Sequence, residues 1–155
     1  MGLEPGGVRG GGDGSRIEHD APFLREFVRL VGQLSQRGLI IDVRGNGGGW
    51  TEYFMIDKLE RKMVAHNTLR GMVPFRYPGS ITTGPIAVVT NEYNGSDGEA
   101  FLEHFKARKL GTVIGVPSWG GLVGIVNGQR TIDNGNVQQS NNSFYGREGT
   151  WWVEN

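Results

Sequence analysis

The sequence has no cysteine among its 155 residues, which removes three classes of protein at once. Secreted domains held by disulfides, zinc sites built on thiolates and enzymes with a cysteine nucleophile all need that side chain. A chain without cysteine suits a reducing compartment, and we expect a cytoplasmic location.

The sequence also lacks an excess of charge of either sign. It has 16 basic and 16 acidic residues, so its formal net charge is zero, and it has no general attraction to nucleic acid or anionic lipid. No apolar run approaches the roughly 20 residues of a membrane span. The N-terminus is rich in glycine rather than apolar, unlike a signal peptide. We therefore expect no nucleic-acid partner and no membrane association.

Glycine, by contrast, is abundant: 27 of the 155 residues are glycine, against about 7% in an average protein. Many of them cluster in residues 2–14, 45–49 and 111–128. The first cluster belongs to residues 1–20, which have too few apolar side chains to offset the entropy of ordering. We predict a Gly-rich disordered leader there, and loops at the other two clusters.

The remaining sequence alternates between helix and strand patterns. Apolar residues at a spacing of 3.6 predict helices, and short apolar runs predict buried strands. The predicted helices are 22–37, with Asp20 and Pro22 at its start, 52–66, capped by Thr51, and a third from Ser96 to about Lys109. The predicted strands are 39–43, 71–77, 86–90, 112–115 and 150–154, with a hairpin of 122–126 and 129–132 around Asn127 and Gly128 and a polar loop over 134–142. This alternation predicts an α/β layer with mainly parallel strands.

Two glycine-rich loops follow predicted buried strands, RGNGGG at 44–49 and NGSDG at 94–98. Loops at the carboxyl ends of parallel strands lie at the same edge of a sheet. Ser96 would stand at a helix N-terminus, where the helix dipole favours a developing negative charge. In one interpretation Ser96 is a nucleophile, and its oxyanion hole consists of the Asp97 amide and an amide of Gly47 or Gly48.

The same residues have simpler interpretations. A serine or aspartate at a helix start is usually a cap. A glycine loop after a strand also suits phosphate, but RGNGGG matches neither GxGxxG nor GxxxxGK[ST]. The residue pattern alone therefore leaves a capping Ser96 and a nucleophilic Ser96 both open. We expect no metal and no cofactor.

Four segments together resemble the catalytic core of the tail-specific and tricorn-type serine peptidases, in the same order and spacing. They are GLIIDVRGNGGG at 38–49, TNEYNGSDGEAF at 90–101, IGVPSWGGLVGI at 114–125 and WWVEN at 151–155. The resemblance implies a crotonase-like α/β sandwich of ββα units, truncated at both ends. It also implies that residues 21–155 are a partial peptidase core without a PDZ module.

The resemblance assigns roles to single residues. It implies that Ser96 is the nucleophile, that the Asp97 amide and a glycine of 47–49 bind the oxyanion, and that Glu154 completes a charge relay. Tail-specific relatives carry a catalytic lysine at the position that Gly121 occupies here. The tricorn-type branch, whose base is a histidine upstream of the core, is therefore the better match.

The three histidines of the chain do not supply an obvious base. His104 lies eight residues beyond Ser96 on the same predicted helix, about 12 Å along its axis. His66 is expected to end a helix in solvent, which leaves His19 in the leader as the candidate base. Because a serine without a base is barely nucleophilic, we expect weak or absent activity from this chain alone.

The expected function is that of a tricorn-type serine peptidase, which hydrolyses peptides or unfolded polypeptides through an acyl-enzyme on Ser96. The alternative is a non-catalytic peptide-binding or assembly remnant of that fold. A third interpretation, stabilisation of an acyl-CoA enolate by the loop amides, fits the serine motif poorly. An uncovered sheet edge leads us to expect a homo-oligomer, most simply a dimer.

Overall fold

The computed structural model describes residues 14–34, 37–125 and 129–151. In chain order the elements are α1 (Gly14–Leu34), β1 (Leu39–Asp42), α2 (Glu52–Glu60), β2 (Ala65–Asn67), β3 (Phe75–Tyr77), β4 (Ile86–Thr90), α3 (Asp97–Ala107), β5 (Thr112–Gly115), β6 (Gln129–Arg130) and β7 (Asn136–Val137).

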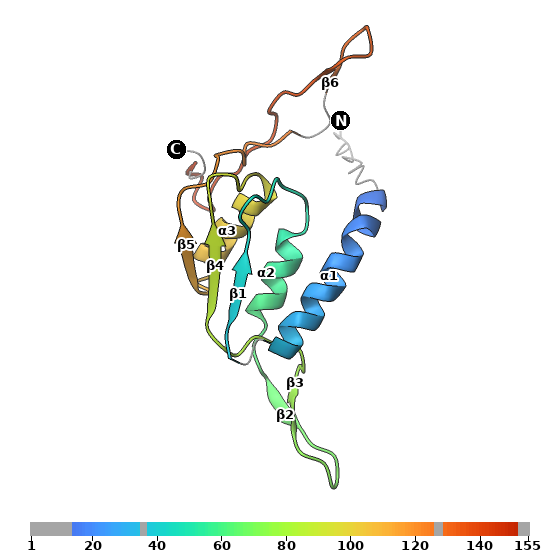
Figure 1. Ribbon diagram of the computed structural model, residues 1–155, viewed down its shortest axis with the longest axis vertical. Helices are drawn as coiled ribbons and strands as arrows, with labels where there is room; N and C mark the ends of the chain where they lie inside the picture. Colours follow the sequence, from blue (N-terminus) through green and yellow to red (C-terminus); the bar gives the residue numbers. More distant parts are fainter. Residues whose placement is uncertain (1–13, 35–36, 126–128, 152–155) are drawn as a thin grey trace, which may run out of the picture.

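A parallel sheet in the order β1-β4-β5 forms the centre of the fold (Figure 1). The three strands are parallel: Leu39 pairs with Ile86, and Ala87 pairs with Thr112. Their carboxyl ends therefore lie at the same edge of the sheet. In β4 the residues Ile86, Val88 and Thr90 are buried, whereas those between them are half-buried. The predicted α/β layer with mainly parallel strands is confirmed for this part of the chain.

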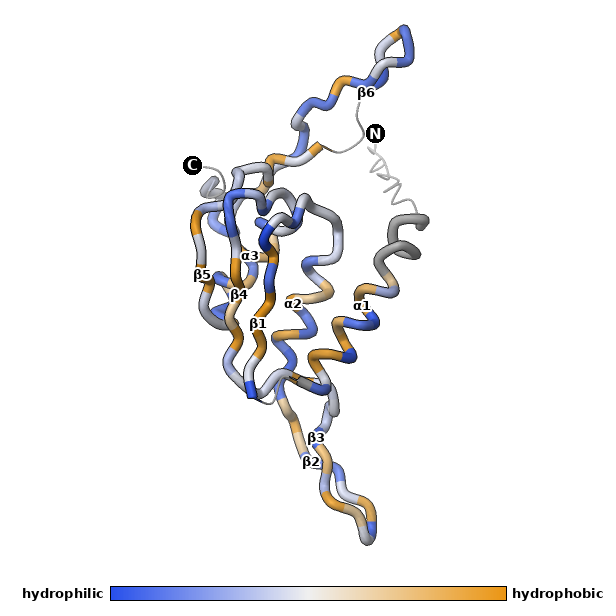
Figure 2. The backbone as a smooth tube through the Cα atoms, viewed as in Figure 1, coloured by the Kyte–Doolittle hydropathy of each residue, from blue (hydrophilic) through white to orange (hydrophobic). Residues whose placement is uncertain are grey.

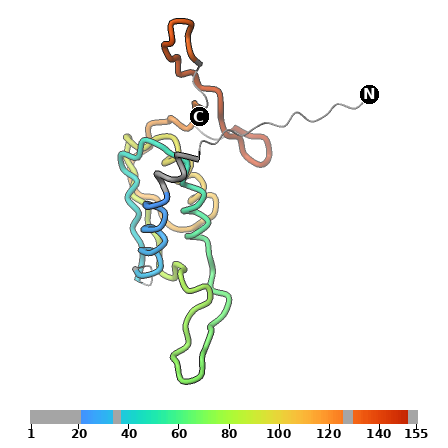
Figure 3. Tube along the Cα trace, turned by 90° about the vertical axis from the view of Figure 1, so that its right-hand side faces the viewer, coloured from blue at the N-terminus to red at the C-terminus, as the bar shows by residue number. Residues whose placement is uncertain are grey.

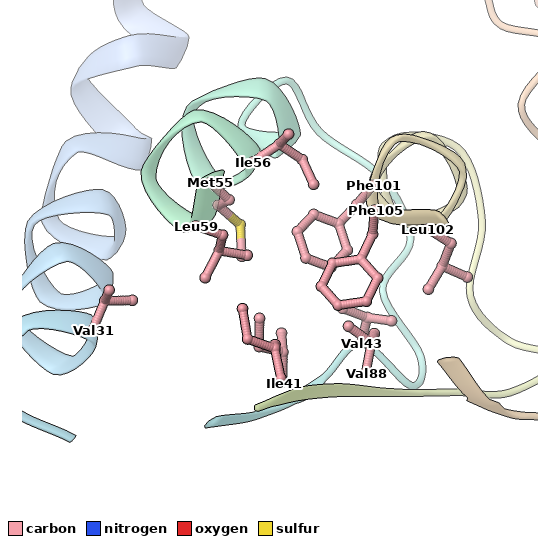
Figure 4. Packing of buried hydrophobic residues seen from close by; sticks show 11 residues of the cluster. Val31, Ile41, Val43, Met55, Ile56, Leu59, Val88, Phe101, Leu102 and Phe105 are labelled. Carbon is pink, nitrogen blue, oxygen red and sulfur yellow. The ribbon is translucent and has the colours of Figure 1, made fainter. Parts of the chain in front are cut away.

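Helices cover one face of this sheet, and the core lies between the two layers (Figure 4). The apolar side chains that α3 directs toward the sheet are one turn apart, and Phe105 is 0% exposed. Figure 2 shows the same pattern in the sequence, since β1 and β4 are mostly hydrophobic whereas α1 and α2 alternate. The buried residues of the core are Val31, Ile41, Val43, Met55, Ile56, Leu59, Ile86, Val88, Phe101, Leu102 and Phe105.

The first helix begins earlier than predicted. It starts at Gly14, so residues 14–20, which we assigned to the leader, are helical, while 1–13 lie outside the described residues. Asp20 is therefore not its cap, and Pro22 stands inside the helix rather than at its start. A proline removes one helical hydrogen bond without preventing the chain before it from being helical, which makes it an ambiguous start signal.

The second helix ends earlier than predicted, at Glu60 rather than at 66. Arg61 has an extended backbone, and β2 then pairs in antiparallel fashion with β3. Because Val64 is 80% exposed, the apolar residues after Glu60 have no core to hold them in a helix. The predicted strand 71–77 is confirmed only from Phe75, since Gly71 adopts a positive φ of 80° in the turn. Figures 1 and 3 show that this hairpin projects from one end of the molecule.

The predicted pairing of 122–126 with 129–132 is wrong. Gln129 pairs with Val137, within the stretch predicted as a loop, and Gly124 forms a bridge with Asn142. Another turn decides this pairing: Asn134 has a φ of 66°, and the Thr131 amide donates to the Gly135 carbonyl. Sequences of this Asp-Asn-Gly kind favour tight hairpin turns.

The last predicted strand, 150–154, is described only in part. Trp151 forms a bridge with Tyr145. Glu154 and the other residues of 152–155 lie outside the described residues. The same holds for Asn127 and Gly128, where we predicted the turn of a hairpin. Over the part of the chain that the structure describes, no helix is both long and apolar enough to cross a membrane.

The core makes a direct stability prediction for Phe105. Replacing Phe105 with alanine leaves a cavity between α3 and the sheet, and we expect the free energy of unfolding to fall by about 3–5 kcal/mol. Urea unfolding followed by circular dichroism measures this change. Phe75→Ala is the matched control, because Phe75 is 44% exposed on the projecting hairpin. Equal losses in the two variants would contradict the assignment of the core.

Candidate active site

The two glycine-rich loops meet at the carboxyl ends of β1 and β4, as the parallel arrangement predicts. The Gly95 amide donates to the Asn46 carbonyl at 2.8 Å. The Gly45 amide donates to the side-chain oxygen of Asn91 at 3.0 Å. Segments almost 50 residues apart in sequence are thereby joined around Ser96.

Ser96 lies at the N-cap position of α3 in a strained backbone conformation, with φ 55° and ψ −121°. An ordinary N-cap residue has a negative φ in the extended region. A positive φ at a residue with a side chain costs on the order of 1–3 kcal/mol and is concentrated at functional sites. Glu99 accepts the Ser96 amide, as in a capping box, but this bond alone does not require such strain. A sharp turn between a strand and a helix is the geometry that exposes the serine of a nucleophile elbow.

Gly48 lies directly against the Ser96 side chain. A Cβ atom on Gly48 would be 2.8 Å from the Cβ of Ser96 and 2.9 Å from its Oγ. Gly48 also has a φ of 115°, which L-residues rarely adopt. Its amide donates to the side-chain oxygen of Asn46 at 2.8 Å. At Gly47, by contrast, an added Cβ would have no neighbour within 4 Å.

The carboxylate of Asp97 ties the end of the first glycine loop to α3. One oxygen, Oδ2, accepts the amide of Thr51 at 2.9 Å and the amide of Glu52 at 3.2 Å. These amides open α2, so Asp97 caps that helix and interacts favourably with its dipole. Thr51 was predicted to do this, but its side chain forms no capping hydrogen bond.

Glu99 was missed by our sequence interpretation. It is 5% exposed, and its carboxylate accepts the amide of Ser96 together with the amides of Gly120 and Gly121. The spacing Ser96-x-x-Glu99 is the signature of a capping box, and it was the available signal.

A pocket of about 530 Å³ opens beside Ser96. Its polar side consists of the 47–49 loop, Glu52, Ser96 and Asp97. Its apolar wall includes Trp50, Ala100, Leu122, Ile125 and Phe144. A pocket of this size, with both polar and apolar lining, can hold an organic ligand or one of its side chains. In the described ranges no group of three or more His, Cys, Asp or Glu residues could hold a metal ion.

Among the residues whose side chains the structure describes, no histidine lines this pocket. His104 forms a hydrogen bond with Glu52, with its Nδ1 2.9 Å from Glu52 Oε2. His66 lies in β2 on the projecting hairpin. His19 falls in the part of α1 whose side chains are not described, so its candidate role as a base stays a prediction.

Glu52 is an acidic residue of the pocket whose pKa is shifted. Burial disfavours its charged form and raises its pKa above the ordinary 4.5, while the hydrogen bond from His104 acts in the opposite direction. The charge of nearby Asp97 raises the pKa of Glu52 further.

Comparisons with known proteins agree with this geometry. Residues 15–155 match the model of peptidase family S41, so the chain belongs to that family. The tricorn protease of Thermoplasma acidophilum is 41% identical over 133 residues, which cover 85% of this chain and 12% of that protein. Tricorn protease homolog 1 of Streptomyces coelicolor is 38% identical over 123 residues, or 79% of this chain and 12% of the relative. The chain therefore spans about an eighth of the length of these relatives.

Solved structures show the same relationship. The crystal structure of the tricorn protease aligns with a TM-score of 0.72 at 40% identity, over 83% of this chain and 13% of that one. A photosystem II D1 C-terminal processing protease aligns with a TM-score of 0.58 at 21% identity, over 88% of this chain and 37% of that one, which shows a shared fold. The resemblance to a tricorn-type peptidase core is confirmed, while the roles of Ser96, Asp97, Gly47, Gly48 and Glu154 stay predictions.

The contact of Gly48 with Ser96 predicts a large difference between neighbouring glycines. We expect Gly48→Ala to lower the free energy of unfolding by about 1–3 kcal/mol, because the added methyl group meets Ser96 at a strained φ. Gly47→Ala adds a methyl group in open space, and we expect a change within about 0.5 kcal/mol. Urea unfolding of both variants tests this difference, and a Gly47→Ala variant as unstable as Gly48→Ala would contradict it.

The surroundings of Glu52 predict pKa changes of opposite sign. His104→Ala removes a partner of the carboxylate and should raise the pKa of Glu52, whereas Asp97→Asn removes a negative charge and should lower it. Carboxyl-detected NMR titration measures both. Because the folded-state pKa is raised, the contribution of Glu52 to stability is complete below about pH 4.5 and is lost as the pH rises through the folded-state value. A Glu52 pKa at or below 4.5 in the unmodified chain would contradict this account.

Proposed function

We propose that this chain is a catalytic core of a tricorn-type serine peptidase, with Ser96 as the nucleophile. The observation that carries the proposal is the strained backbone of Ser96, with φ 55°, at a strand-to-helix turn that borders a pocket. A cap does not need that conformation, whereas a serine held up toward a substrate does. Membership of peptidase family S41 supports the same role.

In the proposed reaction, Ser96 Oγ attacks the carbonyl carbon of a peptide bond and its proton passes to a base. The carbonyl oxygen becomes an oxyanion, which the Asp97 amide and an amide of the 47–49 loop would bind. Since the Gly48 amide donates to Asn46, an oxyanion bound there would replace that acceptor. The base then gives its proton to the leaving nitrogen, and collapse of the intermediate releases the amine and leaves an acyl group on Ser96, which water then hydrolyses.

The Ser96 amide is an unsuitable oxyanion donor, because it donates to Glu99 Oε2 at 2.8 Å. The next amide along the chain, that of Asp97, begins α3 at the positive end of the helix dipole. An added Cβ on Gly48 would lie 3.6 Å from the Asp97 nitrogen, so the two residues that carry the proposed donors are close neighbours.

The substrate that we propose is a peptide or an unfolded polypeptide. An extended peptide would lie along a strand edge near the pocket, with one side chain against Leu122, Ile125 and Phe144. The relatives are named as proteases, which supports this substrate class.

We propose weak activity for this chain by itself. Among the described residues, neither His66 nor His104 lines the pocket that holds Ser96. A histidine base would have to come from His19, from another chain or from a separate part of a longer protein. The same observation favours the alternative function, a peptide-binding core that does not hydrolyse its ligand.

Three finer expectations belong to this proposal. The crotonase-like sandwich of ββα units is supported by the parallel β1-β4-β5 sheet with helices on one face. Self-association is supported by exposed apolar residues on the sheet, with Ile40 75% exposed and Ile114 53% exposed. A cytoplasmic location is supported by the lack of cysteine.

The nucleophile is tested with a fluorophosphonate probe and intact-mass measurement. We expect one label for each chain, absent in Ser96→Ala and retained in Ser118→Ala, a serine that does not line the pocket. Slow labelling that exogenous imidazole accelerates would indicate an intact nucleophile without its base. A folded chain that binds peptides and is never labelled would favour the non-catalytic alternative, and labelling that survives Ser96→Ala would exclude Ser96.

A further inference from the structure

We infer that Glu99 is a positioning residue, whose carboxylate sets the conformation of the Ser96 turn relative to the 119–121 loop. The inference rests on the proposed function, in which Ser96 is the nucleophile. Glu99 does not line the pocket, so it acts on the nucleophile through the backbone and not on the substrate.

The carboxylate of Glu99 accepts hydrogen bonds from two separate segments. Its Oε2 accepts the Ser96 amide at 2.8 Å and the Gly121 amide at 2.8 Å, and its Oε1 accepts the Gly120 amide at 2.6 Å. One side chain therefore fixes the residue that carries the hydroxyl and a loop more than 20 residues further along the chain.

Burial makes these bonds obligatory. Glu99 is 5% exposed, and it forms no salt bridge within the described part of the chain. A buried carboxylate is very unfavourable unless donors surround it, and bonds from amides to a charged acceptor are stronger than neutral ones. Glu99 also stands in the first turn of α3, where the helix dipole favours a negative charge.

The 119–121 loop is shaped to present its amides to this carboxylate. Gly120 has a φ of 87°, which favours glycine. A Cβ on Gly121 would lie 2.4 Å from the ring of Trp119. The Trp119 amide donates to the Asn94 carbonyl at 3.0 Å, so the loop is also joined to the segment just before Ser96. The position of Ser96 and the position of the loop are therefore coupled.

Glu99→Gln is the direct test, because it keeps the shape and removes acceptors. A glutamine side chain has one oxygen, and its NH₂ group would face an amide donor instead of accepting from it. We expect at least one loop amide to lose its acceptor and the Ser96 turn to relax. A small displacement of a catalytic group can cost on the order of 100-fold in rate, so we expect fluorophosphonate labelling to slow at least about tenfold.

Two further variants separate positioning from charge and from general destabilisation. Glu99→Asp keeps the charge at the helix start but is one methylene group too short to serve both segments, and we expect slower labelling here too. Glu103→Gln is the matched control, since it removes a carboxylate one turn later on α3 that pairs with Lys106. Labelling of that variant should match the unmodified chain.

Amide hydrogen exchange measured by NMR supplies a readout that does not depend on reactivity. In Glu99→Gln at least one of the amides of Ser96, Gly120 and Gly121 should exchange at least about tenfold faster, while those of β4 keep their protection. If the unmodified chain is not labelled at all, the proposed function fails, and exchange alone decides the role of Glu99. Unchanged exchange at all three amides, or unchanged labelling of Glu99→Gln in a reactive chain, would overturn the inference. Faster exchange throughout β4 as well would overturn it in favour of a general contribution to stability.

Discussion

The first turn of α3 holds the candidate active site together through two carboxylates that reach in different directions. Asp97 accepts the amides of Thr51 and Glu52, at the end of the first glycine loop. Glu99 accepts the amides of Ser96, Gly120 and Gly121. Each bond joins a charged acceptor to a backbone donor, and both carboxylates stand in the first turn of α3, where negative charge is favoured. These bonds add to the backbone bonds of Gly95 with Asn46 and of Trp119 with Asn94, which join the same three loops around Ser96.

The sheet places this turn where it can act. β4 is the central strand, buried on the face that α3 covers, and it leads directly into the Ser96 segment. Phe101 and Phe105 fix α3 against the core, with ring centroids 5.9 Å apart. The strain at Ser96 can persist because the surrounding structure determines that residue's position through several independent contacts. The stability of the core and the backbone geometry of Ser96 are in this sense coupled.

Much of the arrangement could be predicted from short, strongly patterned segments. The runs at 39–43 and 86–90 are apolar and are followed by glycine-rich loops. Local sequence was therefore enough to predict both strands, and to predict that their two loops lie close together. The end of α2 could not be predicted in this way, because Met63 and Val64 continue the apolar spacing and only tertiary contacts decide that they leave the helix. The pairing of β6 with β7 depended on which of two Asn-Gly turns closes the hairpin, and sequence alone ranks them equally.

The sequence indicated which loop residues would meet at the pocket, but it did not indicate their contacts. Ser96, Asp97, Gly47 and Gly48 do lie together at one pocket. Asp97 has two roles: its amide is a proposed oxyanion donor, and its carboxylate caps a helix that begins 45 residues earlier. The second role cannot be predicted without the fold. Glu99 showed only a local capping signal in the sequence, and its bonds to Gly120 and Gly121 are long-range.

The central claim is that Ser96 is a nucleophile held over an oxyanion site by the first turn of α3. A crystal structure of the chain with a peptidyl boronic acid tests it most directly, because boron forms a reversible tetrahedral adduct with a suitably placed serine. We predict a bond from boron to Ser96 Oγ, a positive φ at Ser96, and one boron hydroxyl about 2.7–3.1 Å from the Asp97 amide and from an amide of the 47–49 loop. A boronate bound in the pocket without that bond, beside a Ser96 with an ordinary negative φ, would contradict the account.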